Sequence, residues 1–117
     1  MSFELHLHTR ELGTVVECRG RMTAGPELSF LRTALINVLK HERRLVLNLD
    51  GLQTIDAAGL GVLATAAATA RERNSYVALC CTPQNIRRLL GTTKLDSVLK
   101  LYESEAKALN NGRCAAA

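Results

Sequence analysis

The alternation of hydrophobic and polar residues at the start of the chain predicts a β-hairpin. Apolar and polar side chains alternate over Phe3–His8, which is the pattern of a strand with one buried face. A turn at Glu11–Gly13 separates this run from a second alternating run, Thr14–Cys18. Two short strands joined by a tight turn pair most simply with each other, so the chain is expected to open with an antiparallel pair.

After the hairpin, segments with a helical period alternate with short apolar runs. A helix opens within Thr23–Glu27, carries leucines at helical spacing and closes at His41–Arg44. The apolar run Leu45–Leu49 predicts a strand at the buried centre of a sheet. The remaining expected elements are, in order, a helix from Asp56 to about Asn74, a strand Ser75–Cys81, a short helix from Pro83 to a break at Gly91–Thr93, a strand Val98–Tyr102 and one or two helical turns over Ser104–Leu109.

This order predicts an α/β fold in which the N-terminal β-hairpin joins a mixed sheet of four to five strands, with about four helices. Helices between successive parallel strands make right-handed crossovers, and the functional surface of such sheets tends to lie at the carboxyl ends of the strands. We expect a single domain over residues 1–109. Residues 110–117 have no periodic pattern and are expected to form a flexible C-terminal tail.

The composition of the chain mainly excludes some classes of protein. The chain has 117 residues, of which 47% are hydrophobic and 22% are charged, the balance of a globular domain. No apolar run approaches the roughly 20 residues of a membrane span. The segment Met1–Glu4 has neither the basic start nor the apolar core of a signal peptide. We therefore expect a cytoplasmic protein.

Charge and cysteine spacing give little support for a nucleic-acid or metal site. The net charge is +4, but the basic residues fall in short groups with acidic residues beside several of them, and two Tyr and two Phe form no stacking platform. The four cysteines have no C-x-x-C spacing. His6 and His8 share a strand face without a third ligand nearby. We expect no nucleic-acid partner, no metal and no cofactor.

The most informative segment is the start of the second long helix. Asp56 suits the N-cap position, because its carboxylate can accept free backbone N–H groups and favours the positive end of a helix. Gly59 and Gly61 follow it, although a glycine inside a helix costs about 1 kcal/mol relative to alanine. Two glycines at this point indicate that a ligand or another protein surface approaches the backbone closely.

A nucleotide is one candidate for that approach. Gly59-x-Gly61-x-x-Ala64 formally fits a dinucleotide-binding fingerprint. However, the charge of Asp56 would lie near a pyrophosphate, and no acidic residue ends the following strand, where Cys80-Cys81-Thr82 stands instead. No Ser-His-Asp set and no pair of carboxylates stands out. A nucleotide-binding enzyme is therefore a remote alternative, and we expect no catalytic residues.

A protein contact is the other candidate, and here the sequence resembles a known family. The segment Leu45–Leu63 is similar to the signature of the STAS domain, the family of the anti-sigma factor antagonists, in which an aspartate and two small residues precede Gly-Leu-Gly. The resemblance extends from the opening hairpin to Leu109 and includes the turn Gly20–Met22 and the segment Thr93–Leu99, which is similar to a late helix of the family. It implies a STAS-like sheet with helices largely on one side, and a non-catalytic module that binds a regulatory protein.

The resemblance also implies where the partner binds. The expected partner-binding residues are Asp56, Ala57, Ala58, Gly59, Leu60, Gly61 and Leu63. In the bacterial antagonists the residue after the aspartate is a serine, which the partner kinase phosphorylates to end binding. This chain has Ala57 at that position, so it lacks the hydroxyl that the switch requires.

We therefore expect an anti-sigma factor antagonist that lacks the usual phosphorylation switch. Its expected partner is an anti-sigma factor of the serine kinase-like ATPase type or another regulatory protein. The alternative is a cytoplasmic STAS subunit or scaffold of a transporter ATPase or of a stress-signalling complex. The sequence leaves room for a weak homodimer.

Overall fold

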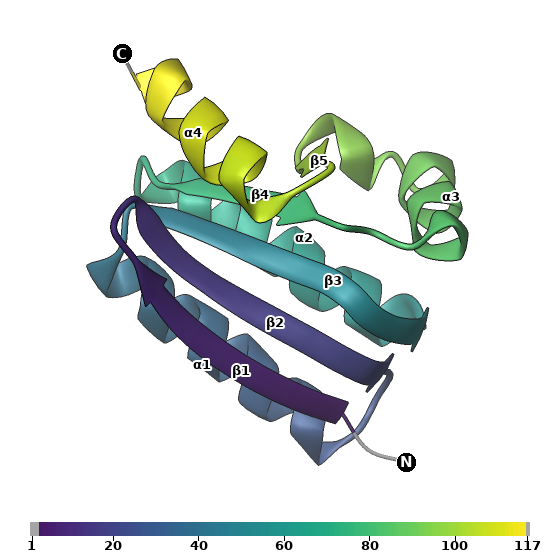
Figure 1. The fold of residues 1–117 in the computed structure, drawn as a ribbon. Helices are drawn as coiled ribbons and strands as arrows, with labels where there is room; N and C mark the ends of the chain where they lie inside the picture. The colour runs from purple at the N-terminus through teal and green to yellow at the C-terminus, as the bar shows by residue number, and fades with distance from the viewer. Residues whose placement is uncertain (1–2, 117) are drawn as a thin grey trace.

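Five strands form one sheet in the order β1-β2-β3-β4-β5, which the computed structural model describes over residues 3–116, with side chains over residues 3–110 (Figure 1). The strands are β1 (Phe3–Arg10), β2 (Gly13–Met22), β3 (Arg44–Ile55), β4 (Tyr76–Cys80) and β5 (Lys100–Tyr102). The helices are α1 (Pro26–His41), α2 (Ala57–Glu72), α3 (Gln84–Thr92) and α4 (Glu105–Ala116), with a one-turn 3₁₀ helix at Leu95–Ser97.

The pairing of the strands confirms the mixed α/β fold. β1 and β2 form the antiparallel hairpin, and β2, β3, β4 and β5 follow one another as parallel neighbours. Each parallel connection contains a helix, α1, α2 or α3. The carboxyl ends of β2 and β3 therefore meet at one end of the sheet, and α2 begins immediately after β3 at that end (Figure 1).

Two hydrophobic clusters cover the two faces of the sheet. The larger cluster joins the sheet to α1, α2 and α3, and the smaller one lies beneath α4. β3 contributes to both, because Leu45, Leu47 and Leu49 belong to the larger cluster and Val46 to the smaller one. The expectations that the apolar run Leu45–Leu49 is central and that the helices lie largely on one side are both confirmed.

The last helix is longer than the sequence predicted, while the expected flexibility of residues 110–117, of which residue 117 lies outside the described residues, stays a prediction. Helix α4 does not end near Leu109 but continues to Ala116. The Ser104 hydroxyl accepts a hydrogen bond from the Lys107 N–H at 3.2 Å, and Ala108 and Leu109 are buried. Once a first turn is held in this way, each further residue adds a hydrogen bond at little cost. The two apolar positions were too short a periodic signal to reveal this.

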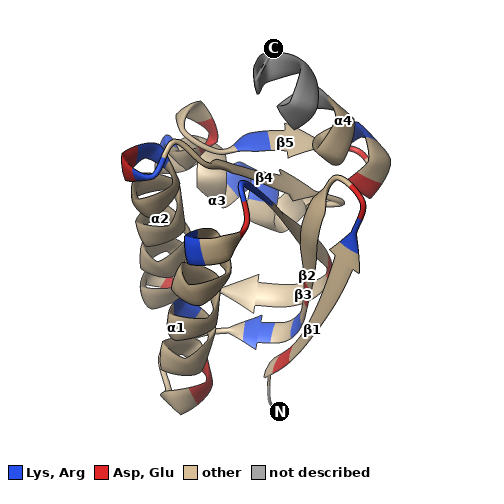
Figure 2. Cartoon of the chain, turned by 90° about the vertical axis from the view of Figure 1, so that its left-hand side faces the viewer, with Lys and Arg blue, Asp and Glu red and all other residues tan. Residues whose placement is uncertain are grey.

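Charged residues are spread over the fold. Figure 2 shows Lys and Arg on several helices and strands, with Asp and Glu among them. Across the part of the chain that the structure describes, no helix is both long enough and apolar enough to cross a membrane.

Candidate functional site

Asp56 caps α2 and also forms a hydrogen bond with the loop between β2 and α1. One carboxylate oxygen accepts a hydrogen bond from the Gly59 N–H at 2.9 Å, which confirms the expected N-cap. The other oxygen accepts a hydrogen bond from the Ala24 N–H at 3.0 Å, although these residues are 32 positions apart. Ala24 lies in the loop between β2 and α1. No local spacing in the sequence points to Ala24, because the contact depends on β2 and β3 being neighbours.

These two hydrogen bonds give Asp56 a measurable pH signature. The backbone N–H groups of Ala24 and Gly59 hold the pKa of the carboxyl below its ordinary value. Because the pKa is lower in the folded chain, the charged carboxylate stabilises the fold above the ordinary pKa of about 4. This contribution is lost as the pH falls through the folded-state value.

We therefore expect Asp56→Asn to lower the melting temperature at neutral pH more than at acidic pH. Asparagine has one acceptor oxygen and no charge, so it cannot hold both N–H groups as the carboxylate does. Thermal unfolding followed by circular dichroism at about pH 7 and about pH 3 measures the difference, with the exposed Asp96→Asn as the matched control. Equal losses at both pH values would contradict the role assigned to the charge.

Gly59 is required by the packing of the chain itself. A Cβ at this position would overlap the backbone carbonyl oxygen of Met22 and lie 2.6 Å from Cγ1 of Ile55. The Asp56 N–H also donates to the Met22 carbonyl at 3.3 Å. The end of β2 thus passes directly against the first turn of α2. This close approach explains the first of the two glycines without any ligand.

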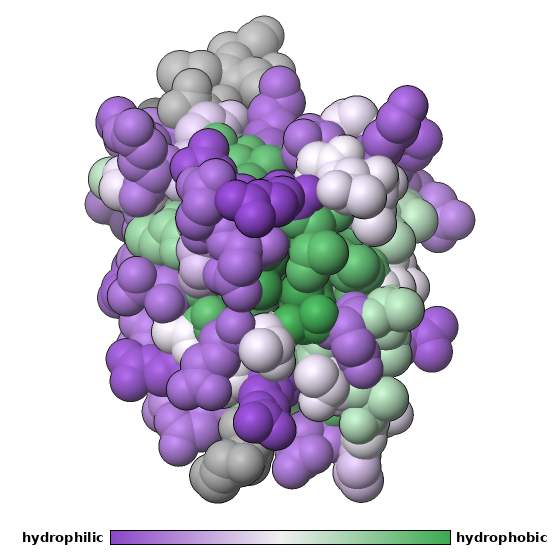
Figure 3. Space-filling model, turned by 90° about the vertical axis from the view of Figure 1, so that its right-hand side faces the viewer, coloured by the Kyte–Doolittle hydropathy of each residue, from purple (hydrophilic) through white to green (hydrophobic). Residues whose placement is uncertain are grey.

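Gly61 has no such explanation inside the chain. It is exposed, and a Cβ there would meet nothing within 4 Å. Ala57 and Ala58 are exposed as well, and Leu60 is half-buried against the larger cluster. We call Ala57, Ala58, Leu60 and Gly61 the α2 face. Figure 3 shows hydrophobic surface gathered at the centre of the side of the molecule on which β2 and β3 end.

Leu63 and Gly59 do not belong to the α2 face, because both are buried within the chain, and their expected contact with a partner stays a prediction. Leu63 is 0% exposed and lies in the larger cluster. The buried positions of α2 are Gly59, Val62, Leu63, Ala66 and Ala70. These residues recur at the three- and four-residue spacing of a single helix face, a signal already present in the sequence. The structure therefore divides the expected site residues between the core and the surface.

The site is poorly suited to a nucleotide phosphate. The Gly59 N–H, which a pyrophosphate would use, is already bonded to the Asp56 carboxylate. A phosphate at this helix start would also face a negative charge rather than free donors. Within the fingerprint Gly59-x-Gly61-x-x-Ala64, the backbone donor at Gly59 is thus already used by the helix cap of the chain itself.

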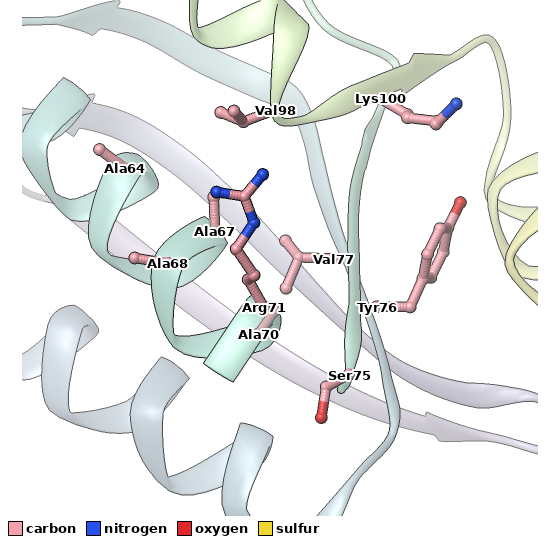
Figure 4. A pocket seen from close by; sticks show the side chains of 10 residues that line it. All are labelled: Ala64, Ala67, Ala68, Ala70, Arg71, Ser75, Tyr76, Val77, Val98 and Lys100. Carbon is pink, nitrogen blue, oxygen red and sulfur yellow. The ribbon is translucent and has the colours of Figure 1, made fainter. Parts of the chain in front are cut away.

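A pocket of about 300 Å³ lies at the opposite end of α2, between that helix, β4 and the residues around the start of β5 (Figure 4). Alanines of α2 and the side chains of Val77 and Val98 give it apolar walls, and Arg71 and Lys100 also line it. The lining residues include the hydroxyl of Ser75 but no carboxylate, imidazole or thiol that could activate it. The pocket therefore contains no triad-like nucleophile and lies outside the α2 face.

Comparison with known proteins identifies the family. The STAS domain model matches residues 5–108, which is most of the chain. The protein belongs to the STAS domain family.

Solved structures share the fold at low sequence identity. An anti-sigma factor antagonist from Mycobacterium paratuberculosis superposes with a TM-score of 0.80 at 22% identity, over 96% of this chain and 95% of that one. The anti-sigma factor antagonist SpoIIAA in its unphosphorylated form gives a TM-score of 0.76 at 16% identity, over 97% of each chain. An anti-sigma-factor antagonist (STAS) domain protein from Planctomyces limnophilus gives 0.79 at 16% identity, over 93% and 97%.

Proposed function

We propose that this protein is an anti-sigma factor antagonist that binds an anti-sigma factor through the α2 face. The family assignment and the similar structures described as anti-sigma factor antagonists support this function. The observation that carries the choice of surface is Gly61. It costs helix stability at an exposed position where the chain itself leaves the space above the backbone empty.

The α2 face suits close contact with a protein. Its exposed side chains are no larger than a methyl group at Ala57, Ala58 and Gly61, so a partner backbone or flat side chain can approach the helix. Leu60 adds a half-buried apolar side chain beside them. The Asp56 cap holds the first turn in place before binding, which reduces the entropy that binding must overcome. The proposal assigns no catalytic role to these groups.

Ala57 decides how such binding is regulated. It is the first residue of α2 and is exposed, at the position where the bacterial antagonists have their phosphorylated serine. A methyl group cannot accept a phosphate. We propose that binding through the α2 face is not ended by phosphorylation at this residue and is set instead by the amounts of the two proteins.

The test is recovery of the partner with matched charge variants of α2. Gly61→Arg places a long cation in the centre of the α2 face at a position with no intramolecular neighbour, so the fold is retained. Ala68→Arg adds the same charge at an exposed position of the same helix, two turns farther from the cap. We expect wild-type and Ala68→Arg baits to recover an anti-sigma factor of the kinase-like ATPase type, and Gly61→Arg to lose it by at least about 100-fold in affinity, or roughly 2.7 kcal/mol.

Equal binding by the two arginine variants, measured by calorimetry with the purified partner, would show that the α2 face is not the contact surface. Recovery of a transporter ATPase in place of an anti-sigma factor would replace the proposed function with the scaffold alternative. Circular dichroism of both variants checks that they remain folded, so that the loss of binding in Gly61→Arg does not come from unfolding.

A further inference from the structure

We propose that a second copy of this chain adds to the free edge of β1, so that two β1 strands pair antiparallel across a twofold axis. The strand order places β1 at one edge of the sheet, where it pairs with β2 on one side only. β1 is 8 residues long, whereas β5 at the other edge has 3. A long free edge presents a row of backbone donors and acceptors to another strand, and a very short one does not.

The side of β1 that faces α1 leaves apolar surface uncovered. Phe3 and Leu5 are only partly buried against the larger cluster, and Leu7 is 52% exposed. Phe30 of α1, at 67%, is the most exposed large hydrophobic side chain of the described residues. A hollow of about 430 Å³ lies between Phe3, Leu5 and Phe30. In Figure 1 the coils of α1 are visible along the free side of β1, so a strand added to β1 would lie over this surface.

Among the antiparallel registers in which β1 can pair with a copy of itself, one places a glutamate opposite an arginine. Residues directly opposite in an antiparallel pair point to the same face, so apolar Phe3, Leu5 and Leu7 cannot pair with the polar positions between them. A twofold axis through Leu7 satisfies this rule and places Glu4 opposite Arg10 in both copies. Opposite charges at facing positions stabilise such a pair, and this complementarity identifies a second copy of the chain as the occupant.

Glu4 and Arg10 are both exposed enough to pair with a second copy of the chain. Within the monomer Glu4 lies 3.8 Å from His6, and Arg10 lies 3.7 Å from Glu105, with side chains 66% and 46% exposed. Exposed side-chain contacts of this length contribute little to stability, so exchanging them for contacts between the two copies costs little free energy. In the same register Leu5 faces Thr9 of the second copy and Leu7 faces Leu7, which covers the exposed leucine.

Sedimentation equilibrium of the full chain tests the pairing. We expect a monomer–dimer equilibrium, and we expect Leu7→Lys to raise its dissociation constant at least about tenfold, because two cations then meet at the axis. Leu89→Lys, which replaces an exposed leucine on α3, is the matched control and leaves the constant unchanged. A chain that is monomeric up to about 1 mM, or a dimer indifferent to Leu7→Lys, overturns the proposal.

Charge exchange and crosslinking test the register. Glu4→Arg and Arg10→Glu are each expected to weaken the dimer, and the double variant is expected to restore it. Under oxidising conditions Leu7→Cys is expected to form a disulfide-linked dimer, because facing residues are within disulfide range. Crosslinking at Leu5→Cys or His6→Cys instead, or no rescue in the double variant, contradicts this register.

The free edge of β1 and the α2 face lie on different parts of the fold, so dimerisation and partner binding can be tested separately. β1 is separated from β3, which leads into α2, by the whole of β2. Loss of the dimer in Leu7→Lys with retained binding of the anti-sigma factor would support both proposals. A Gly61→Arg variant that still dimerises but no longer binds the anti-sigma factor would also support both proposals.

Discussion

Gly59→Ala is expected to destabilise the protein by about 3 kcal/mol, while Gly61→Ala is expected to stabilise it by up to about 1 kcal/mol. The added methyl group at Gly59 overlaps the carbonyl oxygen of Met22, which belongs to the backbone and cannot turn away as a side chain can. At Gly61 the same methyl group meets open space, so only the gain in helix propensity remains. Chemical denaturation of the two variants measures both free energies of unfolding.

The two glycines act as each other's control, since they lie two residues apart in one helix and undergo the same substitution. Opposite signs of the effect would establish that packing against β2 retains Gly59 and that intramolecular packing does not retain Gly61. A loss of stability at both positions would mean that an interaction within the chain also constrains Gly61, and would remove the main support for the α2 face.

Leu63→Ala is the second substitution with a large expected effect, a loss of about 3 kcal/mol. Leu63 is fully buried in the larger cluster, so alanine leaves a cavity between α2 and the sheet. Leu89→Ala on the surface of α3 removes the same atoms from a side chain that is 38% exposed, and is expected to cost much less. Urea unfolding monitored by circular dichroism compares the two variants.

The same variant separates a core role from a contact role. If Leu63 acts only in the core, the folded fraction of Leu63→Ala binds the proposed anti-sigma factor partner with the affinity of the wild type. A fall in affinity beyond the loss of folded protein would show that the side chain reaches the partner, against its burial in the structure.

The fold could be predicted largely because its signals are local. Alternation in Phe3–His8, the apolar run Leu45–Leu49 and the helical spacing of the leucines in α1 each report the surroundings of a single element. The length of α4 was missed because its stability depends on contacts with β4, such as the hydrogen bond from the Tyr76 hydroxyl to the Ala108 carbonyl at 3.1 Å. Such a contact has no signature in the residues of α4 alone.

The sequence identified the segment in which the partner site is proposed, but not how its residues divide between the core and the surface. The sequence identified Asp56 as a cap and both glycines as positions of close approach. It could not show that β2 makes the approach at Gly59, because Met22 comes next to α2 only through the parallel pairing of β2 with β3. The helical period of α2 already places Leu63 on the buried face of the helix, and its expected contact with a partner stays a prediction.

The hydrogen bond from the Ala24 N–H to the Asp56 carboxylate has a consequence for how a partner would recognise the proposed α2 face. It makes the loop before α1 and the start of α2 neighbours in a single footprint that is discontinuous in the sequence. A linear peptide copied from α2 would lack both the loop and the cap geometry, and would be a poor competitor for the partner. Antibodies or inhibitors directed at this region must be selected against the folded domain.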